Sequence, residues 1–228
     1  MTVMLGVPSG RNAITCQTVA TLMNVSEYLK KRDIATSFIS IGHADVTVAR
    51  NILAANFLAS DADTFFGIDD DVGASLNVID LLFQSNLPFI GAFIPQRIIN
   101  LDFFEKQIIE GHRGREARIK AAPLVGAGRI DQTKIGIHQT PHIGTGLYLL
   151  KRSVLEEIID KKIVKKERTQ QVNYAADVYG FFNNIVTTDS GYLSEDYSFC
   201  HRVSSAGILI HGYAGPGVTH TGSMTFSS

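Results

Sequence analysis

The sequence predicts an α/β fold in which helices flank a mostly parallel central sheet, and two observations indicate it. Short apolar runs, typical of strands buried between helices, alternate with longer stretches whose apolar residues follow a helical period. The third apolar run is expected to be a strand, and a helix and another strand follow it, which is the order of a parallel βαβ unit. The 228 residues can bury a substantial core and suit one domain, residues 1–228.

The composition is that of an ordinary globular protein, with 45% hydrophobic residues, 19% charged residues and a net charge of −1. A dominant nucleic-acid surface would be basic, so any such surface must be local. Cys16 and Cys200 lie far apart, each on an apolar helical face, which favours buried free thiols over a disulfide or a zinc site. Free thiols fit a reducing compartment. The chain shows neither a signal-peptide pattern nor an apolar stretch long enough to span a membrane, so we expect a cytoplasmic protein.

The first part of the chain predicts two strands, each followed by a helix. A buried strand is expected over Val3–Val7, because this run is short, apolar and followed by turn-forming residues, and a second strand is expected over Ala35–Ile41. Helices are expected over residues 15–31 and 46–59, and Asp45 precedes the second helix as a candidate N-cap.

Polar residues follow the first strand as the turn Pro8-Ser9-Gly10-Arg11. A turn at this position is a plausible nucleotide-binding loop, and it is equally a plain connection between a strand and a helix. Arg50 lies near the start of the second helix, and an arginine there is by itself typical of a solvated surface.

Three consecutive carboxylates, Asp69, Asp70 and Asp71, end the apolar run that begins at Thr64. Ligands of open α/β sheets bind beyond the carboxyl ends of the strands, so chemistry is expected here. Because side chains alternate along a strand, Asp69 and Asp71 are expected on one side and Asp70 on the other. Two hard oxygen donors suit Mg²⁺ or Mn²⁺. The alternative is a solvated turn or helix cap, but three carboxylates repel one another unless a cation is near.

The next segment predicts a helix over residues 74–84 and a strand over residues 87–94. Gln96 and Arg97 follow this strand, so they are expected at the same edge of the sheet as the acids, within reach of a diphosphate or an acceptor. Residues 100–120 are charged and without a clear period, which indicates an irregular excursion.

A turn bracketed by glycines, Gly144-Thr145-Gly146, comes before another apolar strand. Glycines let the backbone approach a ligand closely, and they are also how a chain bends. Ser153 and Glu156 have the spacing of a capping box that opens the following helix.

The last candidates follow Ser194, a suitable N-cap that places Glu195 and Asp196 in the first turn of a helix. Acids in this turn stabilise a helix dipole, and an exposed one can also act as a general base. A final strand is expected over residues 207–211, and His220 lies after it. A single histidine is more often not a ligand.

The stretch Phe66-Gly67-Ile68-Asp69-Asp70-Asp71-Val72 resembles the D-x-D region of glycosyltransferases with the GT-A fold, especially the small family-2-like enzymes. The resemblance implies that Asp71 binds a divalent Mn²⁺ or Mg²⁺ and that Asp69 contacts the nucleotide-sugar. It also implies that one acid of the pair Glu195 and Asp196 is the catalytic base, as in inverting members, and that His220 returns to the metal. Retaining members share the donor site, so a retaining reaction is the alternative.

The resemblance spans residues 3 to 222. It departs from the family at the extra acid, Asp70, and in the absence of tryptophan, which many members use around the acceptor. The residues expected to hold the donor nucleotide-sugar are Pro8, Ser9, Gly10, Arg11, Arg50, Asp69, Asp70, Arg97, Gly144, Thr145 and Gly146.

The implied function is metal-dependent transfer of a sugar from a nucleoside diphosphate sugar, with a UDP-sugar as the expected donor, to a hydroxyl acceptor. Residues 1–97 would bind the nucleotide-sugar and residues 98–228 would supply the acceptor and catalytic half. A sugar-phosphate nucleotidyltransferase is an alternative, but it should show a basic, glycine-rich loop after the first strand. A non-catalytic nucleotide-sugar-binding module is a second alternative, and the intact acids and His220 argue against it.

The acceptor is the least defined part of the prediction. Without a membrane anchor or a separate acceptor-binding domain, a lipid-linked acceptor is disfavoured, which leaves saccharide, protein or polynucleotide. Two basic segments, residues 112–120 and 161–168, would hold a polyanion such as DNA with a hydroxylated base if they share one face beside the acids.

Overall fold

The computed structural model describes residues 1–10, 12–98, 100–125, 134–167, 177–189 and 191–222; for residues 115, 118 and 119 it describes the backbone alone. Arg11, predicted to bind the donor, and Arg168, at the end of the second basic segment, lie outside the described residues.

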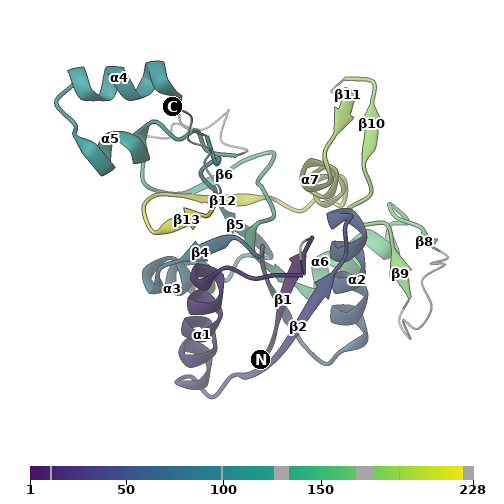
Figure 1. The fold of residues 1–228 in the computed structure, drawn as a ribbon. Coiled ribbons are helices and arrows are strands. Elements are labelled where there is room, and N and C mark those ends of the chain that lie inside the picture. Colours follow the sequence, from purple (N-terminus) through teal and green to yellow (C-terminus); the bar gives the residue numbers. More distant parts are fainter. Residues whose placement is uncertain (11, 99, 126–133, 168–176, 190, 223–228) are drawn as a thin grey trace.

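A seven-stranded sheet forms the centre of the fold, in the order β2-β1-β3-β7-β5-β12-β6 (Figure 1). Five of its strands point the same way: β1 (Thr2–Ser9), β2 (Ala35–Gly42), β3 (Thr64–Ile68), β5 (Phe89–Ala92) and β12 (His211–Ala214). The other two, β7 (Leu147–Lys151) and β6 (Gly136–Gln139), run antiparallel to their neighbours. The predicted α/β fold with a mostly parallel sheet is confirmed. The insertion of β7 between β3 and β5 was not predicted.

Helices cover both faces of this sheet. On one face lie α1 (Cys16–Lys30) and α3 (Leu76–Ser85), and on the other lie α2 (Val46–Ala59), α6 (Arg152–Asp160) and α7 (Glu195–Ser205). Successive strand residues alternate between the two cores: Met4 and Phe65 pack with α2, whereas Leu5 and Phe66 pack with α1 and α3. Both sheet faces are therefore apolar, and the polar residues collect at the strand ends.

Smaller elements surround the sheet. They are the antiparallel pairs β4 (Val72–Ala74) with β13 (Val218–His220), β8 (Lys166–Glu167) with β9 (Val178–Tyr179), and β10 (Ile185–Thr187) with β11 (Gly191–Leu193), and the helices α4 (Leu101–Ile109) and α5 (Gly114–Lys120). Figure 1 shows α4 and α5 projecting to one side of the sheet and the β10–β11 pair projecting next to α7. The prediction of an irregular segment over residues 100–120 was wrong, because it forms these two helices.

Local signals placed several helix starts correctly. The predicted helix over residues 46–59 is confirmed, with the side chain of Asp45 accepting a hydrogen bond from the Thr47 amide at 2.8 Å. Ser194 is the N-cap residue of α7, as predicted, although its side chain makes no capping hydrogen bond. The capping box of Ser153 and Glu156 was wrong, because α6 begins one residue earlier, at Arg152.

Other boundaries need correction. The strand expected over residues 207–211 is β12 (His211–Ala214), and a further strand, β13, follows it; residues 72–74, expected partly in a helix, form β4. Cys16, expected to be buried, is exposed, whereas Cys200 is fully buried as predicted. Within the described residues, the structure contains no helix with the length and apolar character that crossing a membrane requires.

We expect iodoacetamide to alkylate Cys16 and to spare Cys200 in the native protein. The thiolate is the reactive species, and burial raises the pKa of the Cys200 thiol to about 12 while also excluding the reagent. Mass spectrometry should find one modified cysteine in native buffer and two in denaturant. A Cys16→Ser control should take up no reagent until unfolded, and native modification of Cys200 at the rate of Cys16 would contradict the packing around α7.

Candidate functional site

The three consecutive acids form a turn between β3 and β4. The strand ends at Ile68, so the alternation predicted for Asp69, Asp70 and Asp71 does not apply to them. The Asp69 amide donates to the carbonyl of Gly146 at 2.9 Å, which holds the turn against the chain entering β7.

The start of α1 fixes the other side of this turn. The Thr15 amide donates to the Asp70 carbonyl at 2.8 Å, and the Thr18 hydroxyl donates to the carbonyl of Val72 at 2.7 Å. Hydrogen bonds from two neighbouring segments to the backbone of this turn therefore hold it in place.

A single buried cation, Arg50 on α2, joins acids from two distant segments. Only 4% of its side chain is exposed. One terminal nitrogen, Nη2, contacts both carboxylate oxygens of Asp69 at 3.0 and 3.1 Å. The other, Nη1, donates at 2.8 Å to Glu195 Oε1 and at 2.8 Å to Asp196 Oδ1. The turn that carries the three acids and the first turn of α7 are thus held by the two terminal nitrogens of one guanidinium.

The charges in this cluster do not balance. Burial acts to lower the pKa of Arg50, but Asp69, Asp196 and Glu195 outweigh it, so the pKa lies above its ordinary value. Burial raises the pKa of Asp69 to about 6; Arg50 opposes the rise, and Asp196 adds to it. Three carboxylates share one guanidinium, so the cluster carries an excess of negative charge that suits a further cation or a proton.

Thr145 and Gly146 pack tightly against the same cluster. The hydroxyl of Thr145, a buried side chain, donates to Asp196 Oδ1. A Cβ atom on Gly146 would lie 2.9 Å from Asp69 Oδ2 and 2.5 Å from Ile94, so glycine is required at this position. The constraint at Gly144 is weaker, because a Cβ there would approach Val125 at 3.2 Å.

A second cluster lies two residues further along the turn. Asp71 Oδ2 accepts from Arg97 at 2.8 Å, and Asp71 Oδ1 lies 3.2 Å from His220 Nε2. The pairing of β13 with β4 explains how the end of the chain reaches the acids, since it sets His220 opposite Val72. The Thr221 amide also donates to the Asp71 carbonyl at 2.8 Å.

His220 presents one particular nitrogen to Asp71. Its Nδ1 lies 2.8 Å from the carbonyl of Pro95, which can only accept, so Nδ1 carries the hydrogen. Partial burial acts to lower the pKa of His220, but the hydrogen bonds with Asp71 and Pro95 outweigh it, so the pKa lies above its ordinary value.

The donor atoms of Asp71 and His220 fit a divalent cation. If Nε2 gives up its hydrogen to a cation while Nδ1 keeps the bond to Pro95, the imidazole has its lone pair on Nε2, the orientation that a second hydrogen bond gives to metal-binding histidines. The described part of the chain contains no group of three or more His, Cys, Asp or Glu side chains that could hold a metal ion. Two protein ligands do not make a structural site, but Mg²⁺ often has only one or two carboxylates and takes phosphate and water for the rest.

Asp70 and the turn after β1 form a third part of the site. The Ser9 hydroxyl donates to Asp70 Oδ2 at 2.7 Å, and the amide of Ala13 donates to the Ser9 hydroxyl oxygen at 3.1 Å. Pro8 and Ser9 belong to strand β1, so the turn itself begins at Gly10. Asp70, predicted to bind the donor, holds this turn to the acids.

Sequence reasoning missed the support beneath Arg50. Its neighbour Asn51 is buried, accepts from the Phe182 amide at 2.9 Å and donates to Asn183 Oδ1 at 2.7 Å. Arg202 on α7 donates to the carbonyls of Phe181 at 2.9 Å and of Asn183 at 2.8 Å. Two buried polar side chains therefore hold one loop between α2 and α7. Only the adjacency of Asn51 to Arg50 marked it in the sequence.

No protein-family model matches the chain, and no curated protein sequence matches it. Among solved structures, A197 from STIV aligns with 94% of this chain and 82% of its own, at 16% identity and a TM-score of 0.47. A glycosyltransferase involved in the glycosylation of the major capsid of PBCV-1 aligns with 71% of this chain and 64% of its own, at 13% identity and a TM-score of 0.34.

The inositol-1-phosphate CTP transferase from T. maritima aligns with 96% of this chain and 88% of its own, at 10% identity and a TM-score of 0.41. The neighbours thus include a glycosyltransferase and a nucleotidyltransferase. Identities and TM-scores this low establish no function for this chain, so its function must be inferred from the residues of the site.

Arg50→Ala should destabilise the protein by about 3 to 5 kcal/mol at neutral pH, because it leaves three partly buried carboxylates without their cation. Protonation of Asp69 relieves part of the repulsion, so the loss should shrink as the pH falls through its raised pKa of about 6. Urea unfolding at pH 8 and pH 5 measures both effects. Arg32→Ala, which removes a half-exposed pair with Asp80 at 3.3 Å, is the control and should cost less than about 1 kcal/mol. Equal losses for the two variants would show that the Arg50 cluster is not a buried charge network.

Proposed function

We propose that this protein is a metal-dependent glycosyltransferase that moves a sugar from a nucleoside diphosphate sugar, with UDP as the expected nucleotide, to a hydroxyl acceptor. The observation that carries the proposal is the position of Arg50, which contacts Asp69 of the D-x-D turn and both acids of α7 within 3.1 Å. The residues expected to bind the donor and those expected to activate the acceptor are therefore neighbours, as transfer requires.

Asp71 and His220 would hold Mn²⁺ or Mg²⁺ in the proposed enzyme. The bound cation supplies Lewis-acid stabilisation of the negative charge that develops on the leaving diphosphate. Arg97 is half exposed beside Asp71, so it can contact the diphosphate once other ligands occupy that carboxylate. Ser9, Gly10 and the neighbouring Pro8 and Arg11 remain the proposed nucleoside contacts.

Gly146 and Thr145 are proposed to form the wall of the donor-sugar pocket. Gly146 keeps the backbone free of a side chain beside Asp69, and Gly144 leaves open the space near Asp196 Oδ2, which would be 3.8 Å from a Cβ at that position. A sugar held at Asp69 would then have its anomeric carbon on the side that faces α7.

Asp196 is the first candidate for the base. Hydrogen bonds from Arg50 and Thr145 both end on Oδ1, which orients the carboxylate and directs Oδ2 towards Gly144. In the proposed reaction Asp196 takes the proton of the acceptor hydroxyl while the oxygen of that hydroxyl bonds to the anomeric carbon. The bond from that carbon to the diphosphate oxygen breaks on the opposite side, so the reaction inverts the configuration. Glu195, which has one contact with Arg50 at 2.8 Å, is the second candidate.

The nucleotidyltransferase alternative has less support from the described residues. That reaction needs a loop after the first strand whose amides and basic residues surround a triphosphate. Here β1 continues through Ser9, and the Ser9 side chain is bonded to Asp70.

Polynucleotide acceptors also gain little support. Figure 1 places α5, which carries the first basic segment, and β8, which carries part of the second, on opposite sides of the molecule. Within the second segment Lys161 pairs with Glu157 at 3.0 Å and Lys166 pairs with Asp177 at 2.5 Å. The described basic residues therefore do not form one face for a polyanion, and saccharide or protein hydroxyls are the favoured acceptors.

Asp71→Ala should weaken the Mn²⁺-dependent binding of UDP by about 100-fold or more, because it removes the charged ligand of the cation. His220→Ala should cost less, about tenfold, since the lost ligand is neutral. Isothermal titration calorimetry with and without Mn²⁺ measures both. Asp63→Asn, at the other end of β3, is the control and should bind as the wild type does. Unchanged affinity in Asp71→Ala would remove this residue from the site.

Asp196→Asn should lower turnover by about 10² to 10⁴-fold while donor affinity stays near that of the wild type, since a base acts in the transition state. Release of UDP from labelled donor gives the rate, and calorimetry gives the affinity. Glu195→Gln is the matched variant and should retain more activity. If Glu195→Gln were the inactive one, the roles of the two acids would be exchanged; parallel losses of binding and turnover would make Asp196 a structural residue.

A further inference from the structure

The outer edge of β2 is unusually open for a sheet of this kind. In the described part of the chain, β1 is the one strand that pairs with β2, over all eight residues from Ala35 to Gly42. An edge strand presents alternate N–H and C=O groups to its surroundings, ready to pair with another strand.

The sequence of β2, Ala-Thr-Ser-Phe-Ile-Ser-Ile-Gly, lacks the features that usually protect such an edge. It contains no charged residue and no proline, and its regular register with β1 leaves no bulge. The opposite edge, β6, has four residues, begins at a glycine and includes His138. The short β6 is therefore better protected than β2 against pairing with another strand.

Side chains on both faces of β2 are exposed. Ile39 and Ile41 turn towards the core that contains α2, so Thr36, Phe38 and Ser40 lie on the α1 face of the sheet. Phe38 is 55% exposed there. It adds apolar surface at the centre of the open edge, which a pairing strand would cover.

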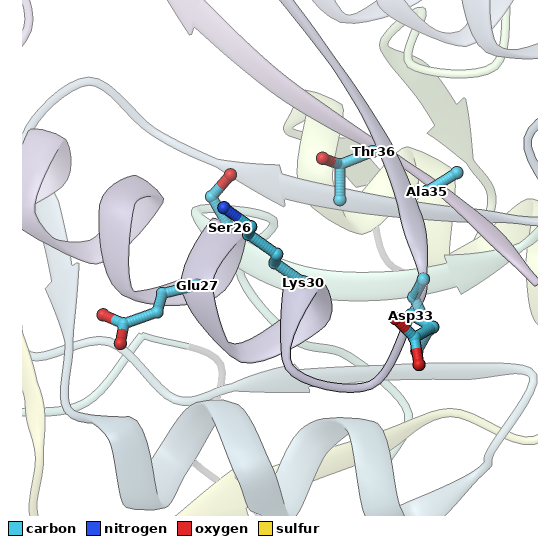
Figure 2. A pocket seen from close by; sticks show the side chains of 7 residues that line it. Ser26, Glu27, Lys30, Asp33, Ala35 and Thr36 are labelled. Atoms are coloured by element: carbon cyan, nitrogen blue, oxygen red, sulfur yellow. The ribbon is translucent and has the colours of Figure 1, made fainter.

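A hollow lies beside the beginning of this strand on the α1 side. It has a volume of about 670 Å³ and lies between α1 and the start of β2. Figure 2 shows Ser26, Glu27 and Lys30 of α1 and Ala35 and Thr36 of β2 among the residues that line it, with Glu27 pointing away from the strand. A strand added to β2 would have room there for its side chains.

We propose that β2 pairs with β2 of a second copy of this chain, antiparallel and about a two-fold axis at Phe38, to give a dimer with one continuous sheet. In this register Phe38 lies opposite Phe38 of the other copy, and Thr36 of each copy lies opposite Ser40 of the other. Directly opposite residues in an antiparallel pair have their side chains on the same face of the sheet. A two-fold axis that passes between the two copies of one residue meets this requirement. The two phenylalanines form an aromatic pair at the centre of the interface.

Charges next to β2 favour this antiparallel arrangement. Lys30, Lys31, Arg32 and Asp33 precede the strand, and Asp45 follows it. Lys31 pairs with Glu27 at 2.7 Å and Arg32 pairs with Asp80 at 3.3 Å within one copy, so Lys30 is the cation that antiparallel pairing brings near Asp45 of the other copy. Parallel pairing would bring basic residues together and leave no two-fold axis through the sheet. The interface is formed by β2 alone, so it is independent of the proposed sugar transfer.

Analytical ultracentrifugation of the full chain, from low to high micromolar concentration, tests the association. We expect the wild type to form a dimer. Phe38→Lys should raise the dissociation constant of the dimer by about tenfold or more, because two lysines would meet at the axis. Met23→Lys changes an exposed residue of α1, 68% exposed, and should leave the dimer intact. A wild type that stays monomeric, or a Phe38→Lys dimer as tight as the wild type, would overturn the proposal. Far-UV circular dichroism verifies that both variants are folded.

Disulfide trapping tests the register separately. In a Cys16→Ser background, Phe38→Cys should form a covalent dimer on oxidation, because directly opposite Cα atoms lie within disulfide reach. Thr36→Cys should not cross-link to itself, yet it should cross-link when mixed with Ser40→Cys. Cys200 is buried and does not interfere. Thr36→Cys cross-linking to itself as fast as Phe38→Cys would contradict the proposed axis.

Discussion

The buried guanidinium of Arg50 is the constraint on which the site depends. It contacts carboxylates from the turn after β3 and from the first turn of α7, segments more than a hundred residues apart in the chain. Placing a cation at 4% exposure is costly unless several acceptors surround it, so α2, β3 and α7 must meet in one arrangement. The buried bonds of Asn51 and Arg202 to the loop between α2 and α7 help to keep that arrangement.

In the same arrangement, three consecutive carboxylates have different partners. Asp69 is committed to Arg50, Asp70 to Ser9, and Asp71 to Arg97 and His220. Each carboxylate therefore has its own partner although the three are consecutive, which limits their mutual repulsion. The site stays negative after these pairings, so the proposed cation, held by Asp71 and His220, would offset charge that would otherwise repel a phosphate-bearing donor.

Features set by local chemistry could be predicted from the sequence, and those set by distant contacts could not. The helix after Asp45 follows from its N-cap and its apolar period, and the acids at the end of β3 follow from the abrupt end of an apolar run. The capping box at Ser153 failed because Arg152 starts α6 and donates to carbonyls at the end of α2, including that of Phe57 at 2.8 Å. The position of β7 between β3 and β5, and the contact of Arg50 with Asp196, depend on topology that short patterns do not encode.

Release of the nucleoside diphosphate from a labelled UDP-sugar, followed in the presence of Mn²⁺ and then of excess chelator, tests the proposed activity most directly. The cluster of Asp71 and His220 predicts release that requires the cation, returns when the cation is restored, and increases when a hydroxyl acceptor is added. Equal release with the chelator present, or incorporation of the nucleotide into a sugar phosphate in place of transfer of the sugar, would contradict it.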